Sequence, residues 1–278
     1  MEELREAAKR KSVDERDWRN DARNTSYFFL NPWFESFFLN GYEIPNPLGM
    51  GAENIRAEML LAAVDAQVVI SLQRALSAYG FNSFRFFAAP LLLTKHVAPF
   101  LDHKSGLVVD IGGETTTILF LSNGFPRSVI VYDNGSEKIN KSLAQEMHLT
   151  PQQAEEIKRD GVAGVLPKGE QTVFLDIASR VAREWARGFL ETLTHTSDVE
   201  VSFSRILLVG GGSAIEQYHE SLRTALEGWG SFLLSSPDIS TFSPIELSRP
   251  FDPQGLLTLH SDIILASMIR EVWNIKKA

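Results

Sequence analysis

Two glycine-rich turns, each placed directly after a run of apolar residues, constrain the fold of this chain most strongly. The first is Asp-Ile-Gly-Gly-Glu-Thr-Thr at 110–116, and the second is Gly-Gly-Gly-Ser at 210–213. Short apolar runs bounded by glycine are typical of buried strands. Glycine also lets the backbone approach a ligand closely and direct several N–H groups at one anion. The pattern therefore predicts two buried strands that end in phosphate-binding turns.

Each turn taken alone also fits a plain connection between two elements, and this alternative stays open. Neither turn continues into Gly-Lys-Ser/Thr, and neither has the glycine spacing of a dinucleotide fingerprint. The first turn leads into a further apolar strand, whereas a dinucleotide pyrophosphate sits at a helix N-terminus. Asp110, at a strand end, is suited to hydrated Mg²⁺, which prefers carboxylates and waters.

The part of the chain after residue 106 predicts an α/β domain. Strands are expected at 107–111, 115–121, 128–132 and 206–209, and helices at 136–147, 150–158, 173–193, 215–226 and 261–275. Asn123-Gly124 predicts a hairpin turn, and Thr150 followed by Pro151 predicts a helix start. The last helix carries an apolar stripe, so we expect it to dock on the domain; a membrane anchor is the alternative.

The first hundred residues predict a smaller α+β unit, with a boundary near residues 103–105. Expected elements are a charged helix within 2–21, extended chain at 27–38, a hairpin turn at Asn40-Gly41, strands at 55–64 and 81–88, and helices at 66–79 and 90–100. Asp65 is expected to cap the first of the last two helices. The predicted domains are therefore 1–103 and 104–278.

Composition excludes several classes of protein. The 278 residues carry a net charge of −8, which argues against a nucleic-acid binder. Without cysteine there is no disulfide scaffold, thiolate zinc site or cysteine nucleophile. No apolar run approaches the roughly 20 residues of a membrane span, and the histidines show no metal-ligand spacing.

A third feature is the segment Ala-Glu-Glu-Ile-Lys at 154–158. On a helix, Glu155 and Lys158 lie on one face, where a carboxylate and an ammonium suit ribose hydroxyls and an adenine edge. Taken alone, this spacing favours an ordinary surface ion pair, which contributes a few tenths of a kcal/mol.

The order of these elements resembles the second half of the actin-like ATPase fold, and within it the FtsA family of bacterial cell division. A strand with Asp-x-Gly-Gly-x-Thr-Thr, a three-strand meander, the Ala-Glu-x-x-Lys helix and a strand before Gly-Gly-Gly follow in that family's sequence. Asn-Gly-Tyr-Glu-Ile-Pro-Asn-Pro-Leu-Gly-Met at 40–50 is similar to a stretch of the inserted subdomain of FtsA. The resemblance implies a ribonuclease-H-like domain with a mixed sheet, preceded by that subdomain.

The resemblance also implies a site for ATP and Mg²⁺. It assigns the second phosphate loop to Gly112, Gly113, Thr115 and Thr116, the metal side to Asp110, the ribose to Glu155 and Lys158, and the adenosine to Gly210, Gly211, Gly212 and Ser213. It further implies FtsZ and other division proteins as partners, self-polymerisation, and a cytoplasmic location at the inner face of the plasma membrane.

Departures from the family pattern lower the expected activity. Glu114 stands in place of the usual third glycine, Thr117 replaces an aspartate, and no Asp-x-Gly-Thr first phosphate loop precedes the subdomain. The short segment 161–173 is more similar to the pilus relative PilM. We therefore expect weak ATP binding at best and at most a weak ATPase. A non-catalytic scaffold, PilM-like or a truncated pseudo-ATPase, is the alternative function.

Overall fold

The computed structural model describes residues 27–30, 33–101, 105–195, 203–228, 237–249 and 251–277. The chain forms two compact units, Met1–Leu91 and Leu92–Ala278. Most of helix α3 (Ala89–His96) thus belongs to the second unit. Its Leu93 is buried together with Val108, a residue of the second unit's sheet. This division falls before the expected boundary near residue 103, and the family assignment of 1–103 and 104–278 stays a prediction. The helix expected within 2–21 lies outside the described residues.

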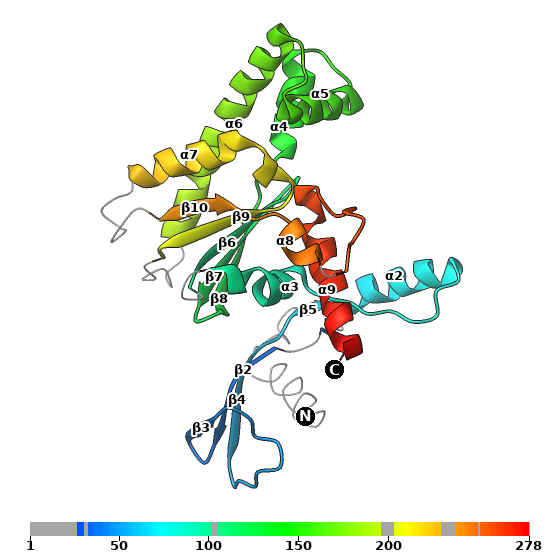
Figure 1. Cartoon of the computed structure of the whole chain (residues 1–278), viewed down its shortest axis with the longest axis vertical. Helices are drawn as coiled ribbons and strands as arrows, with labels where there is room; N and C mark the ends of the chain where they lie inside the picture. Colours follow the sequence, from blue (N-terminus) through cyan, green and yellow to red (C-terminus); the bar gives the residue numbers. More distant parts are fainter. Residues whose placement is uncertain are drawn as a thin grey trace, which may run out of the picture. The chain divides into compact units, whose positions relative to one another are not determined.

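The second unit is built on a five-stranded mixed sheet with strand order β10-β9-β6-β7-β8 (Figure 1). Its strands are β6 (Gly106–Ile111), β7 (Thr116–Ser122), β8 (Phe125–Tyr132), β9 (Arg205–Val209) and β10 (Asp238–Thr241). The first three form the expected antiparallel meander, and β9 pairs parallel with both β6 and β10. The predicted mixed sheet is confirmed, while β10 was not anticipated from the sequence.

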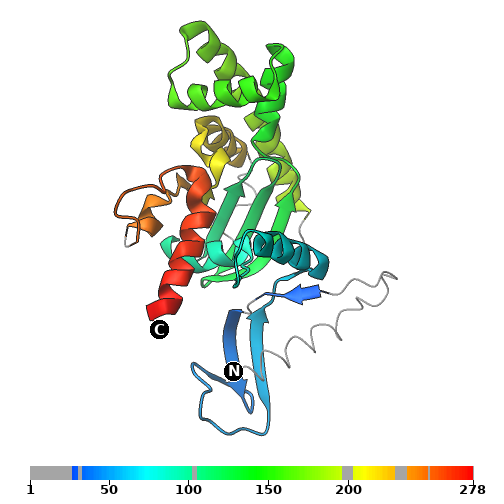
Figure 2. The ribbon, with the colours of Figure 1, turned by 90° about the vertical axis from the view of Figure 1, so that its right-hand side faces the viewer.

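Alternating side chains of the sheet enter two separate cores. On one face, Val109 and Ile118 pack with α4 (Glu137–Glu146), α6 (Lys168–Thr194) and α7 (Glu216–Glu227). On the other face, Val108 and Leu119 pack with α3 and α9 (Ile263–Lys277). Figure 2 shows α9 and the sheet from the side. Strand β6 is buried on both faces, and such a strand has the near-continuous apolar sequence found at 107–109.

Two local signals position the helices that follow the meander. Thr150 caps α5 (Pro151–Ala163) through a complete capping box with Gln153, as the Thr-Pro pair predicted. Gly161 lets α5 lie directly on Phe174 of α6, since a Cβ there would approach the ring to 2.6 Å. The short helices α8 (Ile245–Ser248) and η5 (His260–Asp262) lead into α9. Helix α9 is docked on its own unit, with Ile263 and Ala266 buried.

Helix α9 is also held by an ion pair between the largely buried Glu271 and the half-exposed Lys95. Glu271 accepts hydrogen bonds from Lys95 at 2.7 Å and faces His96 Nε2 at 3.0 Å. Among the described residues, no helix combines the length and hydrophobicity that crossing a bilayer requires.

The described residues of the first unit form two small sheets and the helix α2. Strands β3 (Tyr42–Ile44), β2 (Trp33–Leu39) and β4 (Ile55–Leu60) form one sheet, and β1 (Tyr27–Phe29) pairs with β5 (Ala63–Asp65) in the other. Asn40 and Gly41 have φ of 50° and 87°, the left-handed geometry that a two-residue hairpin turn requires. Asp65 caps α2 (Ala66–Ala78) as expected, but the strand expected at 81–88 is wrong because this segment forms no ladder.

Candidate functional site

The two glycine-rich turns lie side by side at one end of the sheet. Strands β6 and β9 are parallel neighbours with Asp110 opposite Val209, so both turns begin at the same edge. A Cβ at Gly210 would clash with the Asp110 carboxylate and lie 2.8 Å from Ile111 O. Gly210 also has φ of 84°, a conformation that favours glycine. The second turn therefore requires glycine in order to pack against the first.

The first turn offers its backbone N–H groups to the surface. Ser136 N and Glu137 N, at the start of α4, donate to Gly112 O and Gly113 O at 2.9 and 2.8 Å. These hydrogen bonds hold the carbonyl groups of the turn toward α4. The N–H groups of residues 113–115 donate to no backbone acceptor in the described structure, and these three residues are exposed. Consecutive unbonded N–H groups form a concavity that binds anions.

Thr116 differs from the expectation that its hydroxyl meets a ligand. Its side chain is fully buried, and its hydroxyl donates to Asn134 O at 2.6 Å while accepting from Trp185 Nε1 at 2.9 Å. The sequence could not distinguish Thr115 from Thr116, but strand alternation turns the first outward and the second into the core. Thr116 therefore stabilises the turn from within the core, and only the hydroxyl of Thr115 is left exposed.

Asp110 is the residue before the last of β6, and its carboxylate is largely withdrawn from water. Burial raises the pKa of this carboxyl above its usual range. In the described part of the chain, no group of three or more His, Asp or Glu side chains forms a metal cage. One carboxylate still suits Mg²⁺, which usually keeps several waters and takes the remaining oxygens from substrate phosphates.

The raised pKa of Asp110 predicts a pH-dependent cost to folding. Because the folded pKa exceeds the unfolded pKa, stability falls as pH rises between the two values and stays lower above them. Asp110→Asn should therefore raise the Tm at pH 7 and leave it unchanged near pH 3, below the usual Asp pKa of about 3.9. The exposed Asp133→Asn is the matched control. An Asp110→Asn protein with an unchanged or lower Tm at pH 7 would contradict the assignment.

The second turn is fixed by a histidine that sequence reasoning missed. Ser213 Oγ donates to Gly210 O at 2.7 Å and lies 3.0 Å from His260 Nδ1. Since the single hydroxyl proton points to the carbonyl, Nδ1 is the donor and Nε2 carries the lone pair. Burial lowers the pKa of His260, which favours this neutral form. His260 stands 47 residues after Ser213, and no local pattern links the two.

Glu155 and Lys158 form the expected ion pair on α5, with 2.7 Å between Lys158 Nζ and Glu155 Oε2. Burial acts to raise the pKa of Glu155, but hydrogen bonds from Lys158 and Asn140 outweigh it and the pKa is lowered. Asn140, also missed from the sequence, lies on α4, the helix that braces the first turn. The pair is therefore connected to the first turn through α4.

Comparisons with solved structures identify this architecture as the actin-like ATPase fold. A chain of the PilM–PilN type IV pilus biogenesis complex is 20% identical with a TM-score of 0.62, covering 98% of this chain and 73% of that one. EutJ of Carboxydothermus hydrogenoformans is 18% identical (TM-score 0.42; 63% and 53% covered). ADP-bound MreB5 of Spiroplasma citri is 13% identical (TM-score 0.47; 87% and 89% covered).

The family comparison covers most of the site described above, and His260 lies outside the matched residues. No curated protein matches the chain significantly. The profile of the family described as "Cell division protein FtsA" matches residues 107–251, which is more than half of the chain and includes both glycine-rich turns and the Glu155–Lys158 pair. This protein belongs to the FtsA family and has the actin-like ATPase fold.

Proposed function

We propose that this chain is an FtsA-like cytoplasmic adaptor of bacterial cell division that binds ATP with Mg²⁺ at its two adjacent turns. The observation that carries the proposal is the close approach of Gly210 and Gly212 to Ile111, at the start of the first turn. The N–H groups of residues 113–115 in that first turn have no backbone acceptor in the described structure. Backbone donors of this kind suit phosphate oxygens. The name of the matched family supplies the division role.

Each group of the site has a distinct part in this proposal. Gly112, Gly113 and Thr115 bind the phosphates, and Asp110 holds Mg²⁺ through water. Glu155 and Lys158 contact the ribose, and the turn Gly210–Ser213 lies against the adenosine. The groups named here bind and orient a nucleotide, and none of them activates an attacking water, so we expect little or no hydrolysis.

Thermal unfolding with MgATP tests the nucleotide site. A ligand that binds only the folded state, present at 100 times its Kd, raises the unfolding free energy by about 2.7 kcal/mol. The expected Tm increase is roughly 5–10 °C, with no increase from NAD. Gly113→Val should abolish it without loss of fold, because a Cβ at Gly113 meets no atom within 4 Å. An equal shift in wild type and Gly113→Val, or no shift at all, would refute the site.

The side chain of Glu114 supplies a second prediction for this site. Glu114 is exposed in the first turn, between the N–H groups assigned to phosphate. Two like charges about 4 Å apart in water repel by about 1 kcal/mol. Glu114→Gln should therefore lower the Kd for MgATP about fivefold in a fluorescent-analogue titration, whereas Glu156→Gln, on α5, should not. Weaker binding by Glu114→Gln would instead indicate that this carboxylate holds the metal.

A scaffold role in pilus assembly is the second candidate, because the PilM chain aligned with 98% of this one belongs to a complex with PilN. The two roles differ in partner. Purified chain should retain FtsZ from its own source organism in a pull-down and should not retain a PilN peptide. The reverse result favours the pilus role. Self-polymerisation, measured by light scattering with and without MgATP, further separates a filament-forming adaptor from a scaffold.

A further inference from the structure

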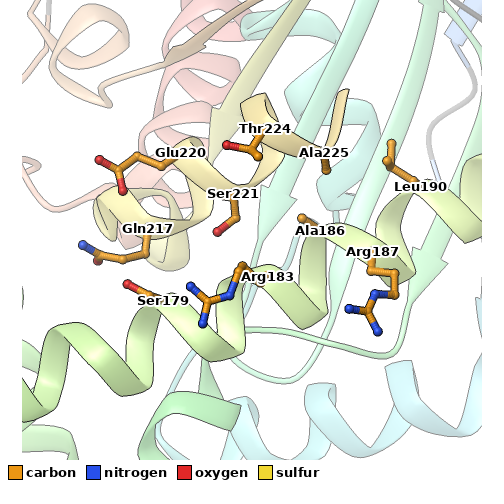
Figure 3. A pocket seen from close by; sticks show the side chains of 10 residues that line it. All are labelled: Ser179, Arg183, Ala186, Arg187, Leu190, Gln217, Glu220, Ser221, Thr224 and Ala225. Atoms are coloured by element: carbon orange, nitrogen blue, oxygen red, sulfur yellow. The ribbon is translucent and has the colours of Figure 1, made fainter. Parts of the chain in front are cut away.

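A cavity of about 410 Å³ lies between α6 and α7, and none of its lining residues belongs to either glycine-rich turn (Figure 3). Its volume falls in the range of small-molecule sites. The hollow exists because small side chains face each other across the helix pair: Ser179 and Ala186 on α6, and Ser221 and Ala225 on α7. Beneath it the helices are tightly packed, with Trp185 and Tyr218 in edge contact at 5.0 Å.

Two arginines without acidic partners line this cavity. Arg183 and Arg187 lie one turn apart on α6 and form no ion pair within the described structure, although the whole chain is acidic with a net charge of −8. Their helix neighbour Arg180 is different, because it is paired with Glu146. Uncompensated guanidinium groups at a hollow are suited to an anionic ligand.

The remaining polar groups of the cavity are mostly neutral donors. Figure 3 shows the Arg183 guanidinium extending along the groove near Ser179 and Ser221, with the Gln217 amide beyond. Glu220 also lines the cavity, but its carboxylate points away from both guanidinium groups. Hydroxyl and amide groups beside arginine supply the further hydrogen bonds that a phosphate oxygen needs when it leaves water.

We propose that the groove between α6 and α7 binds a small phosphorylated molecule. Arg183 binds the phosphate through paired N–H···O hydrogen bonds, and Ser179, Ser221 and Gln217 complete its coordination. Arg187, one helical turn away with its guanidinium directed away from Arg183 (Figure 3), adds positive charge at the groove. The apolar surface of Ala186, Leu190 and Ala225 receives the organic part of the ligand. This site does not depend on the nucleotide site proposed above.

Isothermal titration with inorganic pyrophosphate at low ionic strength tests the groove. We expect binding by wild type and at least a tenfold weaker Kd for the double variant Arg183→Gln/Arg187→Gln. Arg183→Lys should bind with intermediate affinity, since it keeps the charge but loses the planar fork. Lys168→Gln, on the same helix outside the cavity, should bind like wild type. The exposed arginines are not needed for folding, and unchanged Tm values without ligand verify this.

Pyrophosphate could also occupy the first glycine-rich turn, so the titration is repeated with Gly113→Val. Binding that persists in Gly113→Val and disappears in the double arginine variant supports the groove. Binding that disappears in Gly113→Val and persists in the double variant refutes it. No heat with wild type, or binding of a poly-glutamate peptide in place of pyrophosphate, also overturns the proposal.

Discussion

Replacing Trp185 with alanine should lower the free energy of unfolding by about 4 kcal/mol, as expected for a large aromatic side chain in a closed core. Trp185 has no exposed surface and packs against Phe189 and Tyr218, with ring centroids 5.3 and 5.0 Å away. Its indole N–H also donates to Thr116, directly below the first glycine-rich turn. Chemical denaturation monitored by far-UV circular dichroism measures this change.

Two variants separate the contributions to this effect. Trp273→Ala is the matched control, since that side chain is 40% exposed, and it should cost much less than Trp185→Ala. Trp185→Phe keeps most of the packing but removes the hydrogen bond to Thr116, which we expect to cost about 1 kcal/mol beyond the lost volume. Equal losses at the two tryptophans would show that Trp185 is not the centre of the core.

Features encoded by neighbouring residues were predicted well. The Asn40-Gly41 hairpin, the Asp65 cap and the Thr150 capping box each depend on residues within a few positions of one another. The strands before the glycine turns were predicted because an apolar run ending in glycine can be recognised from its own sequence. The mixed sheet was predicted from the resemblance to the actin-like fold.

Features created by tertiary contact were missed or assigned wrongly. His260 and Asn140 reach the candidate site from other elements, without any sequence pattern of their own. Strand β10 is only four residues long and is defined by its pairing with β9. The aromatic segment 81–88 has the composition of a strand, yet it pairs with no other strand. Composition favours extended chain, but a ladder also needs a partner.

The core of the second unit connects the candidate site to the helix pair α6–α7. Trp185 on α6 holds Thr116, and Tyr218 on α7 lies 3.4 Å from Gly135 O through its hydroxyl. Burial raises the pKa of this Tyr218 hydroxyl, so it remains a protonated donor. A change in the spacing of α6 and α7 would therefore move the hydrogen-bond partners of Thr116 and Gly135, which both adjoin the first turn.

Gly135 is a position where a single methyl group should have a large effect on the proposed nucleotide site. It precedes the two residues whose N–H groups hold the first turn, and it lies directly against that turn. A Cβ there would clash with Gly113 O and lie 2.7 Å from Gly112 O, both of them backbone atoms with little room to move. Gly135→Ala should therefore push α4 and the turn apart.

We expect Gly135→Ala to lower the unfolding free energy by about 3 kcal/mol, which is the upper end of the usual cost of adding a group to a well-packed site. The variant should also lose the Tm increase caused by MgATP. Gly169→Ala in α6 is the matched control, because a Cβ there meets no atom within 4 Å and alanine favours the helix by at most about 1 kcal/mol at its second residue. This control should be slightly more stable than wild type and keep its full response to MgATP. A Gly135→Ala protein that responds to MgATP like wild type would show that the nucleotide does not bind at this turn, since the turn cannot keep its shape with a methyl group between its carbonyls and α4.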